Sequence, residues 1–156
     1  MNNTFEIKRI QNYCKDNGVK KDNDVYLKHF LFDDDGNIYK WEFEFPKPNI
    51  LDLRISYPDD IIERQLALVQ IRAFRNKFLR QTDSLVSDRV DNVDDMTEIR
   101  RFRKLLRDLP ANLNQQDLRL NSSNKINVKR YFNKKNFAIA NNLRPYIKTI
   151  LDETEI

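Results

Sequence analysis

Residues 74–113 of the chain read FRNKFLRQTDSLVSDRVDNVDDMTEIRRFRKLLRDLPANL. Two of its segments space their apolar residues three or four positions apart, which is the pattern of amphipathic helices. An acidic stretch separates the two segments, and Pro110 follows the second. The sequence therefore predicts a helical hairpin. The stretch contains no glycine-rich loop and no cluster of catalytic residue types, so it favours architecture over chemistry.

The first helix is predicted over residues 59–81, because no Pro or Gly interrupts that range. Asp59 and Asp60 lie where an N-cap and charges favourable to the helix dipole are expected. The apolar residues of this helix fall on more than one of its sides. They are Ile61, Ile62, Leu66, Leu68, Val69, Ile71, Ala73, Phe74, Phe78 and Leu79. We expect the second helix, the amino-terminal part of the chain or another chain to cover them.

The second helix is predicted over residues 95–109, after an acidic link at 82–95. One of its faces is apolar and an adjoining side is basic. The apolar face carries Met96, Ile99, Phe102, Leu106 and Leu109, and the basic side carries Arg100, Arg103, Lys104 and Arg107. Pro110 is expected to end the helix, because proline lacks an amide proton and clashes with the preceding turn.

Polar residues at the ends of the two helices suggest how the hairpin is held. Thr82 and Asp83 are expected to cap or turn the chain after the first helix, through side-chain hydrogen bonds to backbone amides. Arg75 or Arg103 could then pair with Asp83 or Asp108 across the two helices.

Ahead of the helical hairpin, the clearest local pattern surrounds Asp35-Gly36. Residues 25–32 and 37–45 flank this dipeptide, and the aromatic residues of the second segment alternate with charged ones. Alternation with a period of two is typical of a half-buried strand, and Asp-Gly supplies turn chemistry. A β-hairpin is therefore predicted.

The remaining amino-terminal segments complete the predicted sheet and its support. Residues 4–15 are predicted to form a short helix that stops at Asn17-Gly18. Residues 50–58 are expected to add a short third strand that Pro58 ends. Because two strands alone are marginal in water, the sheet should pack on a helix or a partner.

Together these elements predict an α+β fold, in which a β-hairpin or small three-stranded antiparallel sheet packs on a helical hairpin. Residues 1–58 and 59–110 would build one domain, and residues 111–156 a basic, asparagine-rich extension with a carboxyl-terminal helix. The extension carries 8 basic and 4 acidic side chains, so the excess behind the net charge of +4 lies there. This excess favours an acidic partner or nucleic acid.

Several classes of site lack their usual residues in this sequence. Cys14 is the only cysteine and His29 the only histidine, which disfavours an internal disulfide and the common zinc ligand sets. His29 also has no nucleophile beside it. The DDDG segment at 33–36 lacks the ligand spacing of an EF-hand loop, so a turn is favoured over a calcium site. We predict a protein that is not an enzyme and holds no metal or cofactor.

Two further features bear on location. The longest apolar runs are only a few residues long, and the opening residues MNNTFEIKRI do not resemble a secretory signal. We expect a protein that does not enter the membrane and works in the cytoplasm.

Two blocks within residues 70–112 carry a family resemblance. The first block, R-N-x-x-L-x-x-T-D, consists of Arg75, Asn76, Leu79, Thr82 and Asp83. The second block, aromatic-R-x-x-L-R-D-L-P, consists of Phe102, Arg103, Leu106, Arg107, Asp108, Leu109 and Pro110. In this order, with a variable spacer between them, the blocks resemble the tail assembly chaperone family of bacteriophages. The chain departs from that family at Ser84, where an aromatic residue is usual, and at Phe102, where Tyr is usual.

The resemblance implies a non-enzymatic protein that acts in tail or tail-fibre assembly through contacts with other tail proteins. Such a protein would work in the host cytoplasm during assembly, or in the tail of the virion. An assembly chaperone would bind its partner transiently, whereas a permanent baseplate, fibre or adaptor subunit would stay bound in fixed copy number. A second copy of the chain is a further candidate partner.

The segment KINVKRYFNKKNF, residues 125–137, offers candidate partner contacts. They are Lys129, Arg130, Tyr131, Phe132, Lys134, Lys135 and Phe137. Cations beside aromatic rings also suit phosphates and bases, which keeps a small nucleic-acid-binding protein as an alternative. Because no recognition motif accompanies the segment, a protein-docking face is favoured over nucleic acid.

Overall fold

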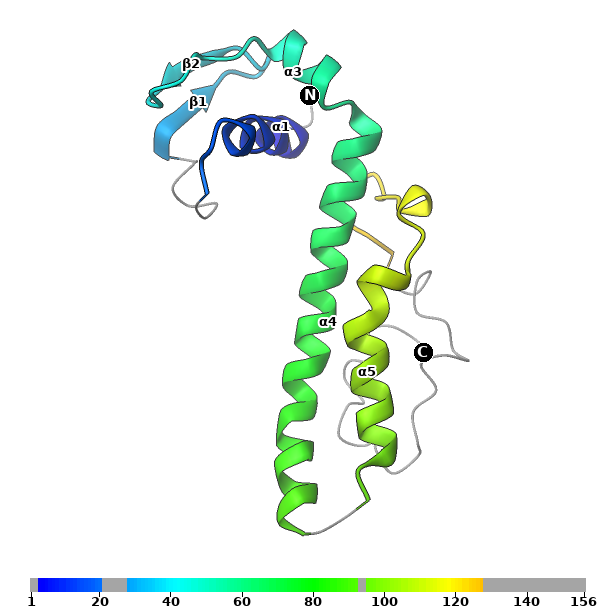
Figure 1. The fold of residues 1–156 in the computed structure, drawn as a ribbon. Coiled ribbons are helices and arrows are strands. Elements are labelled where there is room, and N and C mark those ends of the chain that lie inside the picture. The colour runs from blue at the N-terminus through cyan, green and yellow to red at the C-terminus, as the bar shows by residue number, and fades with distance from the viewer. Residues whose placement is uncertain (1–2, 21–27, 93–94, 128–156) are drawn as a thin grey trace. The chain divides into compact units, whose positions relative to one another are not determined.

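The structure, a computed structural model, describes residues 3–20, 28–92 and 95–127 of the 156-residue chain. Its elements, in chain order, are α1 (Asn3–Asp16), β1 (Phe30–Phe32), β2 (Ile38–Trp41), α3 (Ile50–Ser56), α4 (Asp59–Asp91), α5 (Thr97–Asn112) and the short 3₁₀ helix η1 (Gln115–Asp117). Helices combined with an antiparallel sheet make an α+β fold, as predicted (Figure 1). The chain divides into two compact units, residues 1–66 and 67–156, and the boundary falls inside α4.

In the amino-terminal unit, α1 ends where the sequence predicts. Gly18 has a φ of 91°, which glycine adopts without steric cost. Its N–H donates to the Lys15 carbonyl at 3.0 Å, and the Val19 N–H donates to the Cys14 carbonyl at 3.0 Å. These two bonds are the Schellman pattern that closes many helices. The predicted short helix and its stop at Asn17-Gly18 are confirmed.

The predicted β-hairpin is also confirmed, although its strands are shorter than the predicted segments. The β1 and β2 strands pair antiparallel, with a bulge between Leu31 and Phe32. In the turn, Oδ1 of Asp33 accepts the N–H groups of Asp35 (3.0 Å) and Asn37 (2.8 Å). Hydrogen bonds from Asn37, through its side chain and its backbone, hold the pKa of Asp33 below its ordinary value. The DDDG segment thus uses its first carboxylate as a turn acceptor.

The expected third strand at residues 50–58 is wrong, because this segment forms the helix α3. The side chain of Asn49 accepts the N–H of Leu51 at 2.8 Å and so caps the helix. Ile50 and Leu53, three positions apart, are buried, whereas Ile55 is 80% exposed. This burial follows a helical period, and the cap selects helix over strand. The described sheet therefore has two strands.

The core of the amino-terminal unit is apolar at its centre and aromatic around it. Its buried residues are Ile10, Cys14, Phe30, Ile38, Ile50 and Leu53, and the partly buried Tyr13, Phe32, Trp41, Phe43 and Phe45 pack against them. The ring centroids of Trp41 and Phe43 lie 4.8 Å apart, and Tyr13 donates to the Pro46 carbonyl at 2.9 Å. The hairpin packs on α1 and α3, which meets the need of a two-stranded sheet for support.

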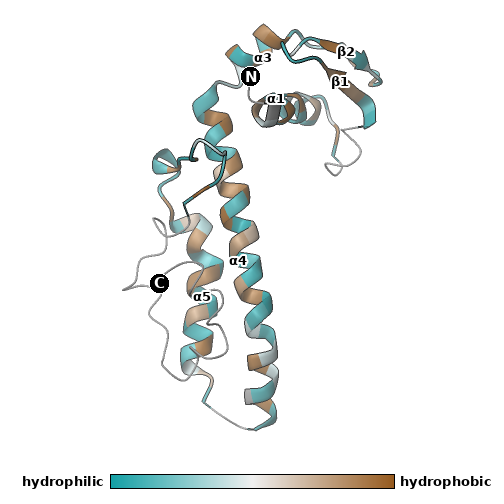
Figure 2. Ribbon diagram, turned by 180° about the vertical axis from the view of Figure 1, so that it is seen from behind, coloured by the Kyte–Doolittle hydropathy of each residue, from teal (hydrophilic) through white to brown (hydrophobic). Residues whose placement is uncertain are grey.

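In the second unit, α5 runs back alongside α4 as the predicted helical hairpin (Figure 1). The buried core consists of Ala67, Ile71, Phe78, Leu85, Ile99, Phe102, Leu106, Leu109, Leu118 and Ile126. The rings of Phe78 and Phe102 meet edge to face, with centroids 6.2 Å apart. Figure 2 shows hydrophobic and hydrophilic residues interleaved along both helices. None of the described helices has the length and apolar content needed to cross a membrane.

The acidic link expected at residues 82–95 is wrong over most of its length, since α4 continues to Asp91. Thr82 and Asp83 lie inside this helix, so they neither cap it nor turn the chain. The Thr82 hydroxyl donates to the Leu79 carbonyl at 2.8 Å, which satisfies it within the helix. Leu85, one turn further on, is buried and extends the apolar stripe of α4. No Pro or Gly stands in the segment to oppose this continuation.

Pro110 does not end α5, which continues to Asn112. Pro110 is buried, and the helix closes beyond it with a bond from the Leu113 N–H to the Leu109 carbonyl at 3.2 Å. A proline in the last turn therefore removes only one donor, and its burial offsets that loss.

The chain after α5 returns to α4. Leu120 and Ile126 form an isolated antiparallel bridge, and the Ile126 N–H donates to the Gln70 side chain at 2.8 Å. Gln70 in turn donates to the Asn124 carbonyl at 2.7 Å. The predicted partner contacts at 129–137 and the predicted carboxyl-terminal helix lie outside the described residues.

Candidate functional site

The two sequence blocks that carry the family resemblance meet in space at Arg103. Nη1 of Arg103 donates to the Leu79 carbonyl at 3.0 Å, to the Thr82 hydroxyl at 2.5 Å and to Oδ1 of Asp83 at 2.7 Å. All three acceptors belong to the first block on α4, and Arg103 belongs to the second block on α5. We call these four residues the Arg103 clasp. The predicted ion pair across the two helices is confirmed for Arg103 and Asp83.

The exposed fraction of the side chains increases across the clasp, from the core to the surface. Thr82 is 1% exposed, the Arg103 side chain is 17% exposed and the Asp83 side chain is 60% exposed. Charge-assisted hydrogen bonds to buried acceptors are stronger than a solvated ion pair. The bonds to Thr82 and to the Leu79 carbonyl should therefore stabilise the hairpin more than the pair with Asp83 does.

The other residues of the two blocks support the hairpin individually. Arg75 donates to the side chain of its neighbour Asn76 at 2.9 Å. Asp108 pairs with Lys104 at 2.6 Å, one turn away on the same helix. The remaining members of the second block divide between core and surface. Phe102, Leu106, Leu109 and Pro110 are buried, and Arg107 is exposed.

Beside the clasp lies an open hollow of about 370 Å³. It is lined by Asn76, Leu79, Arg80, Asp83 and Arg103. Four of these five residues belong to the two blocks. The hollow offers amide, apolar and guanidinium groups together, a mixture that suits contact with another polypeptide.

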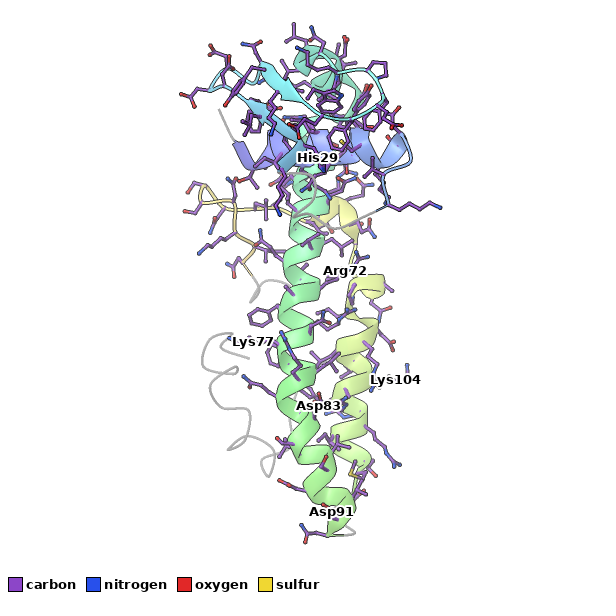
Figure 3. All side chains as sticks on the ribbon, turned by 90° about the vertical axis from the view of Figure 1, so that its left-hand side faces the viewer. His29, Arg72, Lys77, Asp83, Asp91 and Lys104 are labelled. Carbon is purple, nitrogen blue, oxygen red and sulfur yellow. The ribbon has the colours of Figure 1, made fainter. Side chains whose placement is uncertain are left out.

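Charge is unevenly distributed along the helical hairpin. Residues 72–82 of α4 and 99–108 of α5 carry nine cationic side chains and one carboxylate, Asp108. The cationic side chains are Arg72, Arg75, Lys77, Arg80, Arg100, Arg101, Arg103, Lys104 and Arg107. We call this set the cationic band. Figure 3 shows two of its members, Lys77 and Lys104, on different sides of the helical pair.

The end of the hairpin has the opposite sign. Residues 83–98 carry six carboxylates and one cation, Arg89. In Figure 3, Asp91 lies at the end of α4, and Asp83 lies between that end and the cationic band. A negatively charged partner would therefore be attracted to the band and repelled from the end of the hairpin.

Sequence reasoning missed a second charged cluster, which lies in the amino-terminal unit. Glu6 and Arg9 on α1 are each only 3% exposed, and their side chains lie 3.2 Å apart. Arg54 of α3 donates to Oε1 of Glu6 through Nε (3.0 Å) and Nη2 (2.9 Å). Arg9 also donates to the Tyr57 carbonyl at 2.8 Å and pairs with Asp59.

This cluster left only a weak signal in the sequence. Glu6 and Arg9 occupy i and i+3 of a short helix, which is an ordinary surface pair. The positions of Ile7 and Ile10 do not reveal that the neighbouring charged residues turn inward. The partner Arg54 lies 48 residues away, in a segment that we expected to be a strand.

Among the described residues, no group of three or more His, Cys, Asp or Glu side chains is arranged to hold a metal ion. Burial raises the pKa of the Cys14 thiol to about 11, which disfavours the nucleophilic thiolate. Within the described part of the chain, the Arg103 clasp and its hollow contain residues of both predicted sequence blocks, so we take them as the candidate site.

A scan against protein-family models finds no match to this chain, and searches of curated proteins and of solved structures find no significant match either.

Proposed function

We propose that this protein acts without catalysis in the assembly or architecture of a bacteriophage tail, through contacts with tail or tail-fibre proteins. The observation that carries the proposal is the convergence of the two resembling blocks on Arg103. Eighteen residues, 84–101, separate the blocks in the chain, yet Leu79, Thr82 and Asp83 all accept hydrogen bonds from one nitrogen of Arg103. The blocks thus behave as a single structural element.

The convergence also gives a physical reason for a spacer that varies. Residues 84–101 form the end of α4, the connection and the first turn of α5. Adding or removing residues in this range would leave the clasp in place, because its residues on α4 come before the range and Arg103 comes after it. Two fixed blocks with a spacer of variable length are compatible with a helical hairpin that is held together at Arg103.

The surface next to the clasp suits a protein partner. The hollow beside Arg103 has an arginine at its edge, Arg80, which is exposed. Val69, in the same unit, is 51% exposed, so α4 also presents apolar surface. Arginine is enriched at the centres of protein interfaces, where it combines hydrogen bonding with apolar contact.

Two roles fit this surface, namely a transient assembly chaperone and a permanent part of the virion. Quantitative mass spectrometry of purified particles and of infected-cell lysates separates them. A near-integer copy number per particle supports the permanent role. Absence from particles, with co-purification of a tail protein from lysates, supports the chaperone. Absence from particles together with no tail protein co-purifying from lysates contradicts the proposal.

Two charge-reversal variants test whether the partner binds at the hollow beside Arg103. Arg80→Glu reverses a charge at the edge of the hollow, whereas Arg101→Glu reverses one that pairs with Glu98 on α5 and does not line the hollow. We expect Arg80→Glu to reduce recovery of the tail protein about ten-fold or more, as for a charge at an interface, and Arg101→Glu to reduce it less.

A nucleic-acid-binding module is the second candidate, because the cationic band favours polyanions in general. Binding to DNA would weaken steeply with salt, by a slope close to the number of phosphates neutralised. Fluorescence anisotropy with a labelled duplex at several salt concentrations would detect it. Tight, steeply salt-dependent binding would favour this candidate over the tail proposal.

A further inference from the structure

One side of α4 is exposed to solvent over residues 73–90. The residues that define this side are spaced alternately three and four positions apart, which places them on one face of the helix. They are Ala73, Asn76, Arg80, Asp83, Ser87 and Val90, and all of them are exposed. We call this row the outer seam. The same spacing occurs where two helices pack along their length.

The outer seam lies opposite the core of the helical hairpin. Asn76 comes two positions before Phe78, and Asp83 comes two positions before Leu85. Phe78 and Leu85 are 0% and 4% exposed. Two positions along an α-helix correspond to a rotation of about 200°. The core of the second unit therefore leaves the outer seam uncovered.

The charge on this side of α4 changes sign along the helix. Arg72, next to the seam, and Arg80 precede Asp83 and Asp91. Figure 3 shows Arg72, Asp83 and Asp91 in this order along α4. Arg72, Arg80 and Asp91 make no ion pair with any other residue that the structure describes. Asp83 accepts from Arg103 through Oδ1, but its side chain is 60% exposed. These charged groups can therefore receive partners from another molecule.

The outer seam is complementary to itself when two copies run antiparallel. In such a pair, residues at equal distances on either side of the two-fold axis face each other. An axis between positions 81 and 82 places Arg80 opposite Asp83 of the second copy and Arg72 opposite Asp91 of the second copy. Each contact occurs twice by symmetry. A parallel pair in register would instead place each charge opposite its own copy, which is unfavourable.

The uncharged residues of the seam fit the same arrangement. The axis that pairs the charges also places Ala73 opposite Val90 of the second copy and Asn76 opposite Ser87 of the second copy. Val90 is 59% exposed, so it gains apolar contact in the pair. Amide and hydroxyl groups can exchange hydrogen bonds across the seam. Polar residues at such positions select one register at a cost in stability.

We propose that α4 pairs antiparallel with α4 of a second copy of this chain along the outer seam. Few apolar residues contribute, so the dimer is weak and dissociates on dilution. Arg80 and Asp83 also line the hollow beside the clasp, so a second copy and a tail protein compete there. The inference goes beyond the proposed function. It is tested on the purified chain alone, so its failure leaves the tail proposal standing.

Sedimentation velocity of the purified full chain gives the first test. Loading concentrations from about 10 µM to about 500 µM cover the range of weak dimers. A monomer–dimer equilibrium is expected, in which the dimer fraction rises with concentration. A chain that stays monomeric at every concentration would overturn the proposal, as would association into species larger than a dimer.

Two charge reversals test the antiparallel register. Arg72→Glu and Asp91→Lys each place like charges opposite each other at both ends of the dimer, so each should raise the Kd about ten-fold or more. An equimolar mixture of the two variants restores opposite charges at both ends, and its Kd should return to within about three-fold of the unmodified chain. Lys20→Glu makes an equal charge change at an exposed residue outside α4 and should leave the Kd unchanged.

Circular dichroism checks that every variant is folded. The double variant Arg72→Glu/Asp91→Lys exchanges the charges within one chain and should dimerise as tightly as the unmodified chain. A single variant that dimerises as tightly as the unmodified chain would overturn the proposed register. A mixture of the single variants that remains monomeric, or a monomeric double variant, would overturn it as well.

Discussion

The two units of this protein use arginine in different ways. Arg9, in the amino-terminal unit, is 3% exposed and sits in a network of two guanidinium groups and two carboxylates. Arg103, in the second unit, lies at the edge of an apolar core and bonds to a carbonyl, a hydroxyl and one largely exposed carboxylate. One arginine is enclosed among charges, and the other joins two helices whose packing is already apolar.

The two units should therefore be sensitive to different substitutions. A buried ion network costs free energy to desolvate, so removing one member leaves an uncompensated charge inside. An arginine at the rim of an apolar core can be lost with less damage, because the side chains beneath it still pack. Substitutions in the two units should therefore differ in their cost to stability.

The largest effect is expected from the apolar core of the second unit. Phe102 is 1% exposed and contacts Phe78, so Phe102→Ala should destabilise this unit by about 3–5 kcal/mol. Urea unfolding followed by far-ultraviolet circular dichroism measures the loss. Val69→Ala, at a position 51% exposed, should stay within about 0.5 kcal/mol. A loss for Phe102→Ala no larger than that of Val69→Ala would contradict an apolar core here.

The buried network of the amino-terminal unit should come next. Arg9→Met keeps much of the side-chain volume but leaves Glu6 with one fewer cation, and it should cost about 3 kcal/mol. Trp41 is the only tryptophan and packs against the core of this unit, so its fluorescence reports the unfolding. Lys104→Met removes a pair whose lysine is 76% exposed and should cost less than about 1 kcal/mol. Equal costs would show that burial does not distinguish the two ion pairs.

A smaller loss is expected at the clasp. Arg103→Lys keeps the charge but loses the planar guanidinium group, and it should cost about 1–2 kcal/mol in urea unfolding. Thr82 and the Leu79 carbonyl would each lose a donor. Arg101→Lys is the matched control, because Arg101 pairs with exposed Glu98 on α5. If the two variants were equally stable, the clasp would be no more than a surface pair.

The smallest effect at neutral pH is expected from ionisation of the Cys14 thiol, because it changes the free energy of unfolding only at alkaline pH. Burial raises the pKa of its thiol from 9.0 to about 11, so the unfolded state loses the proton first as the pH rises. The buried thiol of Cys14 makes its full contribution to the free energy of unfolding below pH 9. This contribution declines towards pH 11, by at most about 1.4 kcal/mol per pH unit. Burial and the hydrogen bond to Asp16 raise the pKa of Tyr57 to about 12, which adds a loss in the same direction above pH 10.

Urea unfolding between pH 7 and pH 11 measures this dependence. Cys14→Ala should be less stable at neutral pH, because a buried side chain becomes smaller, but its stability should fall less steeply above pH 9. If the free energy of unfolding fell equally steeply with pH in the two proteins, Cys14 would not be the cause of the loss.

The sequence predicts the elements that depend on residues close together in the chain. The Asp-Gly turn, the stop at Asn17-Gly18 and the apolar stripe of α5 each depend on residues close together in the chain. These three features needed no knowledge of the tertiary structure. An ion pair across the two helices is also predicted, but the sequence leaves Arg75 or Arg103 and Asp83 or Asp108 as its members, and the fold selects Arg103 and Asp83.

The failures share a different cause. Residues 50–56 have an apolar pattern that fits either a strand or a helix, and the cap at Asn49 with the core around Leu53 decides for the helix. The helix α4 passes through Thr82 because the clasp and the core satisfy a residue that often ends helices. The network around Glu6 depends on three segments that only the fold brings together. The cap at Asn49 is a local signal, whereas the core around Leu53, the clasp and the network around Glu6 are tertiary contacts that override local preference.

We infer that Arg103 joins the two sequence blocks into one element, and a double-mutant cycle between Arg103→Met and Thr82→Val measures this coupling. Free energies of unfolding in urea are needed for the unmodified chain, the two single variants and the double variant. We expect a coupling of about 1 kcal/mol or more, because each substitution alone removes one hydrogen-bond partner of the other group. Additive losses, with a coupling near zero, would show that the blocks are neighbours that this hydrogen bond does not join.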